Sequence, residues 1–255
     1  MRLLLDLGNT RLKWVLQGQP QGWLEHGAVD WREADPADAL AAAWAPLPKP
    51  VQVMAASVVD TPREAQVAAV TQRLFGLAPG WLRTPAHACG VRNAYAEPQR
   101  LGIDRFLAMV AAQAEGRSPC VLAGVGTALT LDALAADGRH LGGLIAPGPR
   151  LMQDSLLDAT VRVRTGQPGA VVDLADNTAD AVASGCWHAA AALIERFATR
   201  NADRLGSAPN LVLGGGDAAS LLPLLSLPAQ LSPDGVLRGL VVWAARDEDA
   251  AVRLE

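Results

Sequence analysis

The sequence predicts an α/β protein of two similar halves with a cleft between them. Residues 3–16 read LLLDLGNTRLKWVL, and this apolar run, Gly-Asn-Thr turn and alternating run form the pattern of a β-hairpin. Residues 120–134, CVLAGVGTALTLDAL, repeat the pattern around Gly126. Because Gly8 and Gly126 lie 118 residues apart in a chain of 255, the unit recurs at about half the length. Unrelated domains also contain strand–turn–strand units, and the repeat alone leaves that alternative open.

After the hairpin, the first half predicts helices and strands in alternation. Apolar spacing predicts helices at residues 38–44, 63–75 and 103–115. Short apolar runs predict strands at residues 51–59 and 81–83. Residues 84–100 contain scattered prolines and a glycine, so an irregular segment is expected there.

The second half opens with three predicted strands between residue 119 and about residue 145, followed by a Pro-Gly-Pro break. Helices are expected at residues 151–160, 178–200 and 236–246, with a loop at 166–176. A strand at 210–213 enters three glycines at 214–216. We expect the domain boundary within 115–119, which gives domains at residues 1–116 and 117–255.

The composition excludes several classes of protein. The chain is 50% hydrophobic and 19% charged, with a net charge of −4 and no run of Lys or Arg, so a nucleic-acid partner is not expected. No apolar run is long enough to span a membrane, and Asp6 interrupts the N-terminal one too early for a signal peptide. Three cysteines without paired spacing favour a reducing compartment. A soluble cytoplasmic protein without a membrane partner is therefore expected.

The first hairpin has the features of a nucleotide-phosphate site. A carboxylate that ends a buried strand, as Asp6 does, is costly unless it is paired, hydrogen-bonded or bound to a cation. Gly8 allows a ligand to approach the backbone, and Asn9 and Thr10 offer hydrogen bonds to phosphate oxygens. A carboxylate for magnesium beside such a turn suits phosphoryl transfer. The alternative is a plain hairpin in which Asp6 and Asn9 only satisfy the turn.

A second group of chemical residues lies in NAYAEPQRLGIDRF, residues 93–106. Asp104 falls at the predicted start of a helix, near the positive end of the helix dipole. There it can accept a hydroxyl proton during phosphoryl transfer. Arg105 can bind a carboxylate with two hydrogen bonds, and Tyr95 is the only tyrosine of the chain. The alternative is a helix-capping Asp104 beside a solvated Arg105.

Five segments occur together and in order: DLGNT (6–10), Tyr95 and Pro98 before LGIDR (101–105), GTALTLD (126–132), GGLIAPG (142–148) and DNTADAVASG (176–185). In this set the chain resembles the bacterial type III pantothenate kinases, relatives of actin, Hsp70 and the sugar kinases. The resemblance implies two ribonuclease-H-like (actin-like) domains with a nucleotide cleft between them. It also implies ATP-dependent phosphorylation of pantothenate to 4'-phosphopantothenate, the first step of coenzyme A synthesis. Members are homodimers in which the partner subunit helps to form the pantothenate pocket.

The resemblance also implies a role for each matching residue. Asp6 holds Mg²⁺, and Asp104 is the general base on the pantothenate hydroxyl. ATP phosphates meet the first turn and its strand (Gly8, Asn9, Thr10, Lys13) and a second turn (Gly126, Thr127, Ala128). Tyr95, Gly102 and Arg105 surround the substrate, and Thr178 reaches the pantothenate pocket from the neighbouring subunit. The glycines at 214–216 lie near adenine. Two plainer alternatives stay open, since Thr178 can simply cap its helix and the three glycines can form an ordinary strand–helix turn.

One position departs from the family pattern. Members commonly carry an acidic residue two positions before the glycine of the second turn, linked in several of them to a monovalent cation, whereas this chain has Gly124. A requirement for K⁺ or NH4⁺ is therefore doubtful, although Asp132 or backbone carbonyls can supply ligands instead. A second functional hypothesis is a non-catalytic nucleotide-binding accessory or regulatory protein of the same fold. The presence of both Asp6 and Asp104 favours the enzyme, because a regulator needs no base aimed at a hydroxyl.

Overall fold

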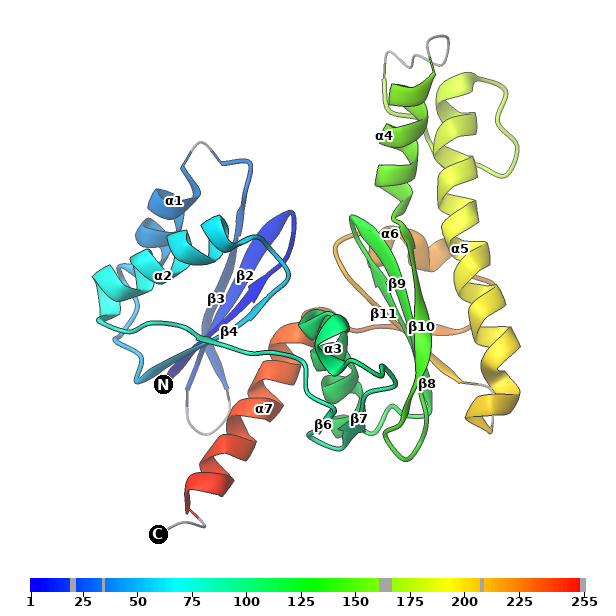
Figure 1. Ribbon diagram of the computed structural model, residues 1–255. Helices are drawn as coiled ribbons and strands as arrows, with labels where there is room; N and C mark the ends of the chain where they lie inside the picture. Colours follow the sequence, from blue (N-terminus) through cyan, green and yellow to red (C-terminus); the bar gives the residue numbers. More distant parts are fainter. Residues whose placement is uncertain (19–21, 34, 161–166, 207–208, 253–255) are drawn as a thin grey trace. The chain divides into compact units, whose positions relative to one another are not determined.

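The computed structural model describes residues 1–18, 22–33, 35–160, 167–206 and 209–252 (Figure 1). The chain divides into two compact units, which are described separately below. Unit 1 comprises Met1–Glu115 and Gly235–Glu255, and unit 2 comprises Gly116–Asp234. No helix among the described residues is long and apolar enough to cross a membrane.

Within the described residues, unit 1 contains one five-stranded sheet in the order β3-β2-β1-β4-β5, a small hairpin and four α-helices. β1 pairs with β2, and β2 with β3, in antiparallel fashion, whereas β1–β4 and β4–β5 are parallel. The elements are β1 (Arg2–Leu7), β2 (Arg11–Gln17), β3 (Trp23–Asp30), α1 (Pro36–Trp44), β4 (Gln52–Ser57), α2 (Thr61–Phe75), β5 (Gly80–Trp81), β6 (His87–Ala88), β7 (Val91–Arg92), a 3-10 turn (Pro98–Arg100), α3 (Ile103–Ala114) and α7 (Gly235–Val252).

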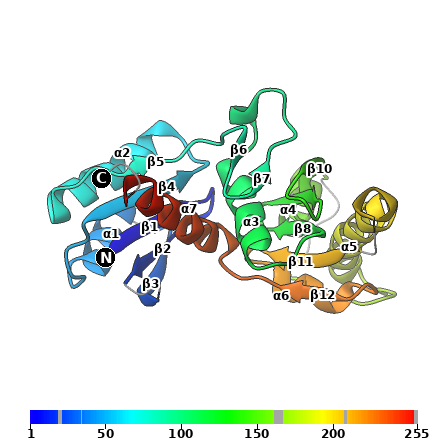
Figure 2. The ribbon, with the colours of Figure 1, turned by 90° about the horizontal axis from the view of Figure 1, so that it is seen from below.

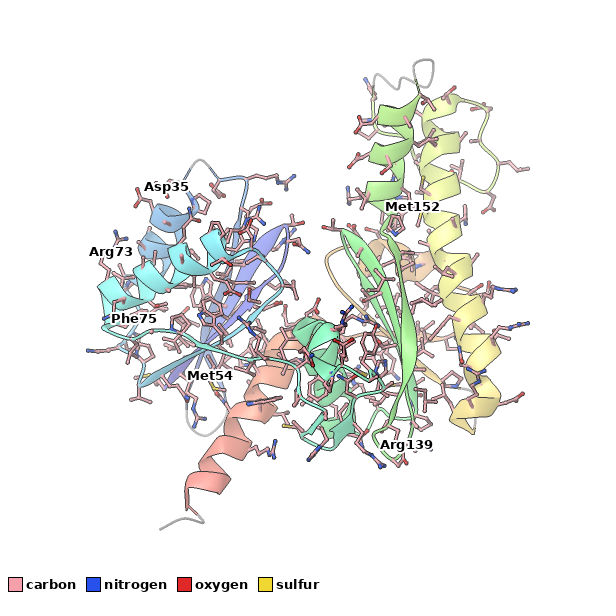
Figure 3. The ribbon with its side chains drawn as sticks, viewed as in Figure 1. Asp35, Met54, Arg73, Phe75, Arg139 and Met152 are labelled. Carbon is pink, nitrogen blue, oxygen red and sulfur yellow. The ribbon has the colours of Figure 1, made fainter. Side chains whose placement is uncertain are left out.

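Helices cover both faces of this sheet, which explains the nearly continuous apolar run of β1. Leu3, Leu5 and Leu7 pack with residues of α1 and α2, whereas Leu4 packs on the other face with residues of α3 and α7. Met54, labelled in Figure 3, belongs to the second of these clusters. A strand buried on both faces loses the alternation of a half-exposed strand.

Unit 2 repeats the same sheet order as β10-β9-β8-β11-β12, with the same two antiparallel and two parallel pairings. Val121, Leu129 and Leu131 pack against apolar residues of the long helix α5. The elements are β8 (Cys120–Val125), β9 (Ala128–Leu134), β10 (His140–Pro147), α4 (Pro149–Ala159), α5 (Thr178–Leu205), β11 (Asn210–Gly214), α6 (Ala218–Leu221), a 3-10 turn (Leu222–Leu224) and β12 (Ala229–Leu231). The predicted fold of two ribonuclease-H-like halves is confirmed.

The last helix belongs to unit 1 and not to the second domain, where it was expected. The order of the sequence places residues 236–246 in the second domain, but α7 packs in unit 1 against α3, β1, β2 and β4 (Figure 2). Leu237, Leu240 and Ala244 are buried in that core, and the backbone of α7 at Gly239 approaches Leu107 too closely for a side chain. Burial of this apolar stripe against the sheet determines where the helix lies.

Smaller differences concern short elements. The irregular segment 84–100 contains the β6–β7 hairpin and a 3-10 turn, and β12 and α6 had no sequence signal strong enough to predict them. The loop expected at 166–176 carries no helix or strand over residues 167–176, and residue 166 lies outside the described residues.

Candidate active site

The first phosphate turn connects β1 to β2 in unit 1. The amide of Gly8 donates a hydrogen bond of 3.1 Å to the carbonyl of Arg11, which leaves Asn9 and Thr10 at the tip. Asp6 and Lys13 are direct partners in the antiparallel ladder. Residues that face each other across such a ladder point to the same side of the sheet. The predicted metal-binding carboxylate and the predicted phosphate-binding lysine therefore share one face.

That face is the one covered by α3 and α7. Side chains alternate along a strand, so Asp6 shares its face with Leu4, which packs against those two helices. β1 and β4 are parallel, and Val58, just beyond β4, donates its amide to the carbonyl of Leu7 at 3.1 Å. Gly102, which precedes α3, lies close enough that its Cβ would stand 3.9 Å from Val58 Cγ1. The structure thus brings Asp6 and the start of α3 to the same edge and the same face of the sheet.

At the start of α3, the Asp104 carboxylate lies directly beside Gly102. Asp104 Oδ1 accepts a hydrogen bond of 2.8 Å from the amide of Arg105. A Cβ on Gly102 would collide with this same oxygen, so only glycine leaves room for the observed carboxylate position. Gly102 itself is the capping residue of the helix, and Asp104 lies in its first turn. The alternative that Asp104 is the N-cap is therefore wrong.

Arg105 is buried rather than solvated, with 6% of its surface exposed. Its Nη1 donates to the hydroxyl of Tyr95 at 3.2 Å, so the two predicted substrate residues are in contact. A buried guanidinium next to a phenol can recognise a carboxylate or hydroxyl of a small acid. The two side chains lie in contact, and the burial of Arg105 excludes a purely solvated guanidinium.

The loop that carries Tyr95 is held by residues that the sequence did not single out. Asn93 Oδ1 accepts from the amide of Tyr95 at 3.0 Å, and Asn93 Nδ2 donates to the carbonyl of Pro98 at 3.1 Å. The buried Thr84 donates its hydroxyl to the carbonyl of Leu101 at 2.7 Å, which fixes the end of the loop beside α3. The one available signal was the position of Asn93 inside a Pro- and Gly-rich segment, where asparagine often satisfies turn backbone.

The second predicted phosphate turn lies in unit 2, between β8 and β9. The amide of Gly126 donates to the carbonyl of Ala128 at 3.1 Å, and the amide of Gly148 donates to the carbonyl of Thr127 at 2.9 Å. Gly215, with φ +94°, lies against the backbone of Val125 where a Cβ would collide. The segments GGLIAPG and the glycines at 214–216 therefore converge on this turn.

Thr178 is the first residue of α5, and its side chain does not cap the helix. Asn177 does so by accepting from the amide of Asp180 at 3.0 Å, so the capping alternative for Thr178 is wrong. The first turns of α5 also hold the preceding segment, since Asp180 accepts from the amide of Ala170 and Ser184 from that of Val172. Hydrogen bonds from Asn177 and from the amide of Ala170 lower the pKa of Asp180, which favours its charged form.

Gly124 is spatially restricted on the side of β9. Its Cβ would come within 2.5 Å of Thr130 Oγ1. Asp132, the alternative carboxylate in this unit, is buried with its Oδ1 2.8 Å from His140 Nε2. A carboxylate engaged in this way with a buried histidine is a poor candidate for a cation ligand. Within the described residues, no group of three or more His, Cys, Asp or Glu side chains could hold a metal ion.

Two units with one sheet order, each with a glycine turn after its first strand, have the ribonuclease-H-like fold of the actin-like and sugar-kinase proteins. The sequence model of type III pantothenate kinases matches residues 2–200. The chain belongs to the type III pantothenate kinase family, and the predicted class of enzyme, a phosphotransferase, is confirmed.

Three relatives named type III pantothenate kinase illustrate the extent of the match. The protein of Aromatoleum aromaticum is 39% identical over 98% of this chain and 100% of its own length. Those of Stenotrophomonas maltophilia and Xanthomonas oryzae are 42% and 43% identical, each over 94% of this chain and 96% of its own length. The similarity thus covers both halves of the chain.

Solved structures agree with the fold at much lower identity. The activator of 2-hydroxyisocaproyl-CoA dehydratase from Clostridium difficile, solved with bound ADPNP, matches with a TM-score of 0.57 at 12% identity, over 100% of this chain and 97% of its own. Component A of (R)-2-hydroxyglutaryl-CoA dehydratase from Acidaminococcus fermentans matches with a TM-score of 0.53 at 12% identity, over 94% and 95%. These likenesses support the two-domain fold.

Proposed function

We propose that this chain transfers the γ-phosphoryl group of ATP to pantothenate, forming 4'-phosphopantothenate in the first step of coenzyme A synthesis. Family membership supports the reaction. The single structural observation that carries the proposal is the placement of Asp6 and the Asp104 helix start at one edge and face of the unit 1 sheet. A kinase needs a metal-binding carboxylate and a hydroxyl-directed base near the same phosphate. We also propose that the reaction occurs in the cytoplasm.

The first turn and the second turn bind ATP in this proposal. Asp6 fits a Mg²⁺ site, because proteins hold this ion through one or two carboxylates together with substrate phosphates. The bound ion would neutralise charge on the transferring phosphoryl group. Asn9, Thr10 and Lys13 would bind phosphates from the first turn and its strand. Gly126, Thr127 and Ala128 would do so from the second turn, with the glycines at 214–216 near adenine.

Asp104 would accept the proton of the pantothenate hydroxyl as that oxygen attacks phosphorus. Its carboxylate lies in the first turn of α3 and accepts a hydrogen bond from the Arg105 amide, which fixes the direction in which it points. Arg105 and Tyr95 would hold the substrate, with Arg105 directed at the pantothenate carboxylate. Gly102 contributes by leaving space for the base.

The test is an ADP-release assay in which pantothenate and each member of a panel of sugars are supplied separately as the phosphoryl acceptor. Release of ADP that depends on pantothenate and is absent with sugars supports the proposal. Release with a sugar instead would assign the chain to another branch of the superfamily. Nucleotide binding without release on any acceptor would favour the accessory, non-catalytic alternative.

We further propose that the chain forms a homodimer through unit 2, with Thr178 reaching the partner's pantothenate pocket. Large apolar side chains are exposed on β10, on α4 and in the segment before α5: Leu144, Ile145, Leu151, Leu156 and Leu174. Leu174 is 95% exposed, although the neighbouring segment 170–172 is hydrogen-bonded to α5. A held segment that presents apolar groups to solvent is typical of an interface.

Substitution within this apolar surface is expected to weaken the dimer. Ile145→Asp should weaken self-association by about tenfold or more and raise the KM for pantothenate, with a smaller change for ATP. Leu24→Asp is a matched control, because Leu24 is 53% exposed on β3 of unit 1. Sedimentation velocity measures the association. Equal association of wild type and Ile145→Asp would place the interface elsewhere or show the chain to be monomeric.

Gly124 predicts a weak response to potassium. This position carries no carboxylate to add charge to a monovalent cation site, so adding K⁺ to sodium- and potassium-free buffer should change turnover by less than about twofold. Restoring the acid in Gly124→Asp displaces Thr130, whose hydroxyl occupies the space. The double variant Gly124→Asp/Thr130→Ala removes that collision and should gain a response. Strong activation of wild type by K⁺ would contradict the prediction and direct the search to other ligands.

A further inference from the structure

We propose that Trp31 is a positioning residue that sets the first phosphate turn for nucleotide, an inference that rests on the ATP-binding role proposed above. The Nε1–H of Trp31 donates a hydrogen bond of 2.6 Å to the carbonyl of Gly8. The backbone amide of the same residue donates to the carbonyl of Thr10 at 3.0 Å. One residue, 23 positions beyond Gly8, therefore holds carbonyls on both sides of Asn9.

These two bonds orient the turn through the geometry of the peptide group. A trans peptide is planar, so its C=O and N–H point in opposite directions. Because the Gly8 carbonyl is turned toward Trp31, the amide N–H of Asn9 in the same peptide is turned away from it. The carbonyl oxygens of Gly8 and Thr10 therefore lie on the Trp31 side of the turn, and the N–H of Asn9 lies on the opposite side. Amide donors arranged in this way bind phosphate oxygens.

Trp31 is itself held firmly. It directly follows β3, whose last residue Asp30 pairs with Arg11 of β2. The Asp30 carboxylate accepts from the backbone amide of Arg32 at 2.9 Å and from its guanidinium at 2.7 and 3.0 Å, and these bonds hold the pKa of Asp30 well below its usual range. The guanidinium carbon of Arg63 lies 5.6 Å from the centre of the indole ring. These contacts fix the position of the indole ring, and its N–H therefore donates to Gly8 from a defined direction.

Comparison of the two halves shows which part of this arrangement is particular to the first turn. Gly148 follows β10 as Trp31 follows β3, and its amide donates to Thr127 as the Trp31 amide donates to Thr10. The backbone bond is therefore common to both units. In unit 2 the position must be glycine, since a Cβ would collide with the carbonyl of Gly126. The side-chain bond occurs at the first turn, where the unit 1 residue has room for an indole.

The experiment compares Trp31→Phe with Trp44→Phe. Both tryptophans pack in the same apolar cluster, but Trp44 is fully buried and its Nε1 has no hydrogen-bond partner among the described residues. Each variant loses ring volume, and only Trp31→Phe loses a hydrogen bond to the turn. Trp31→Phe should raise the KM for ATP and the Kd of a nonhydrolysable ATP analogue with Mg²⁺ about three- to tenfold. Its KM for pantothenate should change less than about twofold, as that site lies outside the turn.

Trp44→Phe should lower the melting temperature while leaving nucleotide affinity at the wild-type value. Replacing Trp31 with 3-benzothienylalanine keeps the ring shape, removes the N–H donor and should reproduce the rise in Kd if Trp31→Phe folds poorly. Equal nucleotide affinity in wild type and the benzothienyl variant overturns the inference. Wild type that binds nucleotide but does not phosphorylate pantothenate defeats the proposed reaction alone, because the Kd comparison still decides the role of Trp31. Wild type that binds no nucleotide defeats both.

Discussion

Replacement of Asp104 with asparagine is expected to reduce the turnover of pantothenate phosphorylation by about 10²–10⁴-fold, the usual contribution of a general base. Asparagine keeps the size of the side chain and can still accept from the Arg105 amide, so the start of α3 should be preserved. It cannot take the hydroxyl proton. Steady-state ADP release at saturating ATP and pantothenate measures the loss, and calorimetry should show nucleotide affinity close to that of wild type.

Gly102→Ala provides a second variant that displaces the carboxylate without removing it. The new Cβ would occupy the place of Asp104 Oδ1, which is the end of a short flexible side chain and can rotate away. The backbone at Gly102, with φ −54°, suits alanine, so the melting temperature should hold while turnover falls. If Asp104→Asn retains near-wild-type turnover, Asp104 is not the base, whatever Gly102→Ala does.

Local sequence patterns predicted the parts of the fold that depend on neighbouring residues. The hairpin around Gly8, its repeat around Gly126 and the helix beginning at Ile103 each follow from apolar periodicity and turn residues close in sequence. The location of α7 depends instead on which distant surface buries its apolar stripe. The pattern of residues 236–246 indicates a helix with a buried side, and it carries no information on whether that side meets unit 1 or unit 2.

The same distinction applies to the candidate site. Asp6 was identifiable because a carboxylate that ends a buried strand is costly unless it is paired or bound, and Asp104 because it lies in the LGIDR segment that resembles the family. Trp31 and Thr84 were not, since each acts through a hydrogen bond to backbone at least 17 residues away. In sequence, a tryptophan that donates to a turn looks the same as one that only fills a core. Such positioning residues are recognised only when the structure shows the backbone carbonyl to which each side chain donates.

Asp6→Asn is expected to have the second largest effect, through the metal ion. A neutral amide is a poorer ligand than a carboxylate for a hard divalent cation. The concentration of Mg²⁺ that gives half-maximal activity should therefore rise about 10- to 100-fold, the range seen when the carboxylates around a bound metal are altered. Asp104→Asn is the matched control. It removes a carboxylate from α3, the helix that covers the same face of the sheet, and it leaves the proposed metal ligand in place.

The sign of the effect without metal separates a ligand from a residue that only shapes the turn. Asp6 faces Lys13 across the ladder, and both lie where the phosphates are proposed to bind. In the presence of a chelator, loss of the Asp6 charge reduces repulsion of the free polyphosphate, so metal-free ATP should bind Asp6→Asn at least as well as wild type. Mg²⁺-ATP should bind it less well. A parallel loss in both conditions would indicate a damaged turn, and identical Mg²⁺ titrations of wild type and Asp6→Asn would remove Asp6 from the metal site.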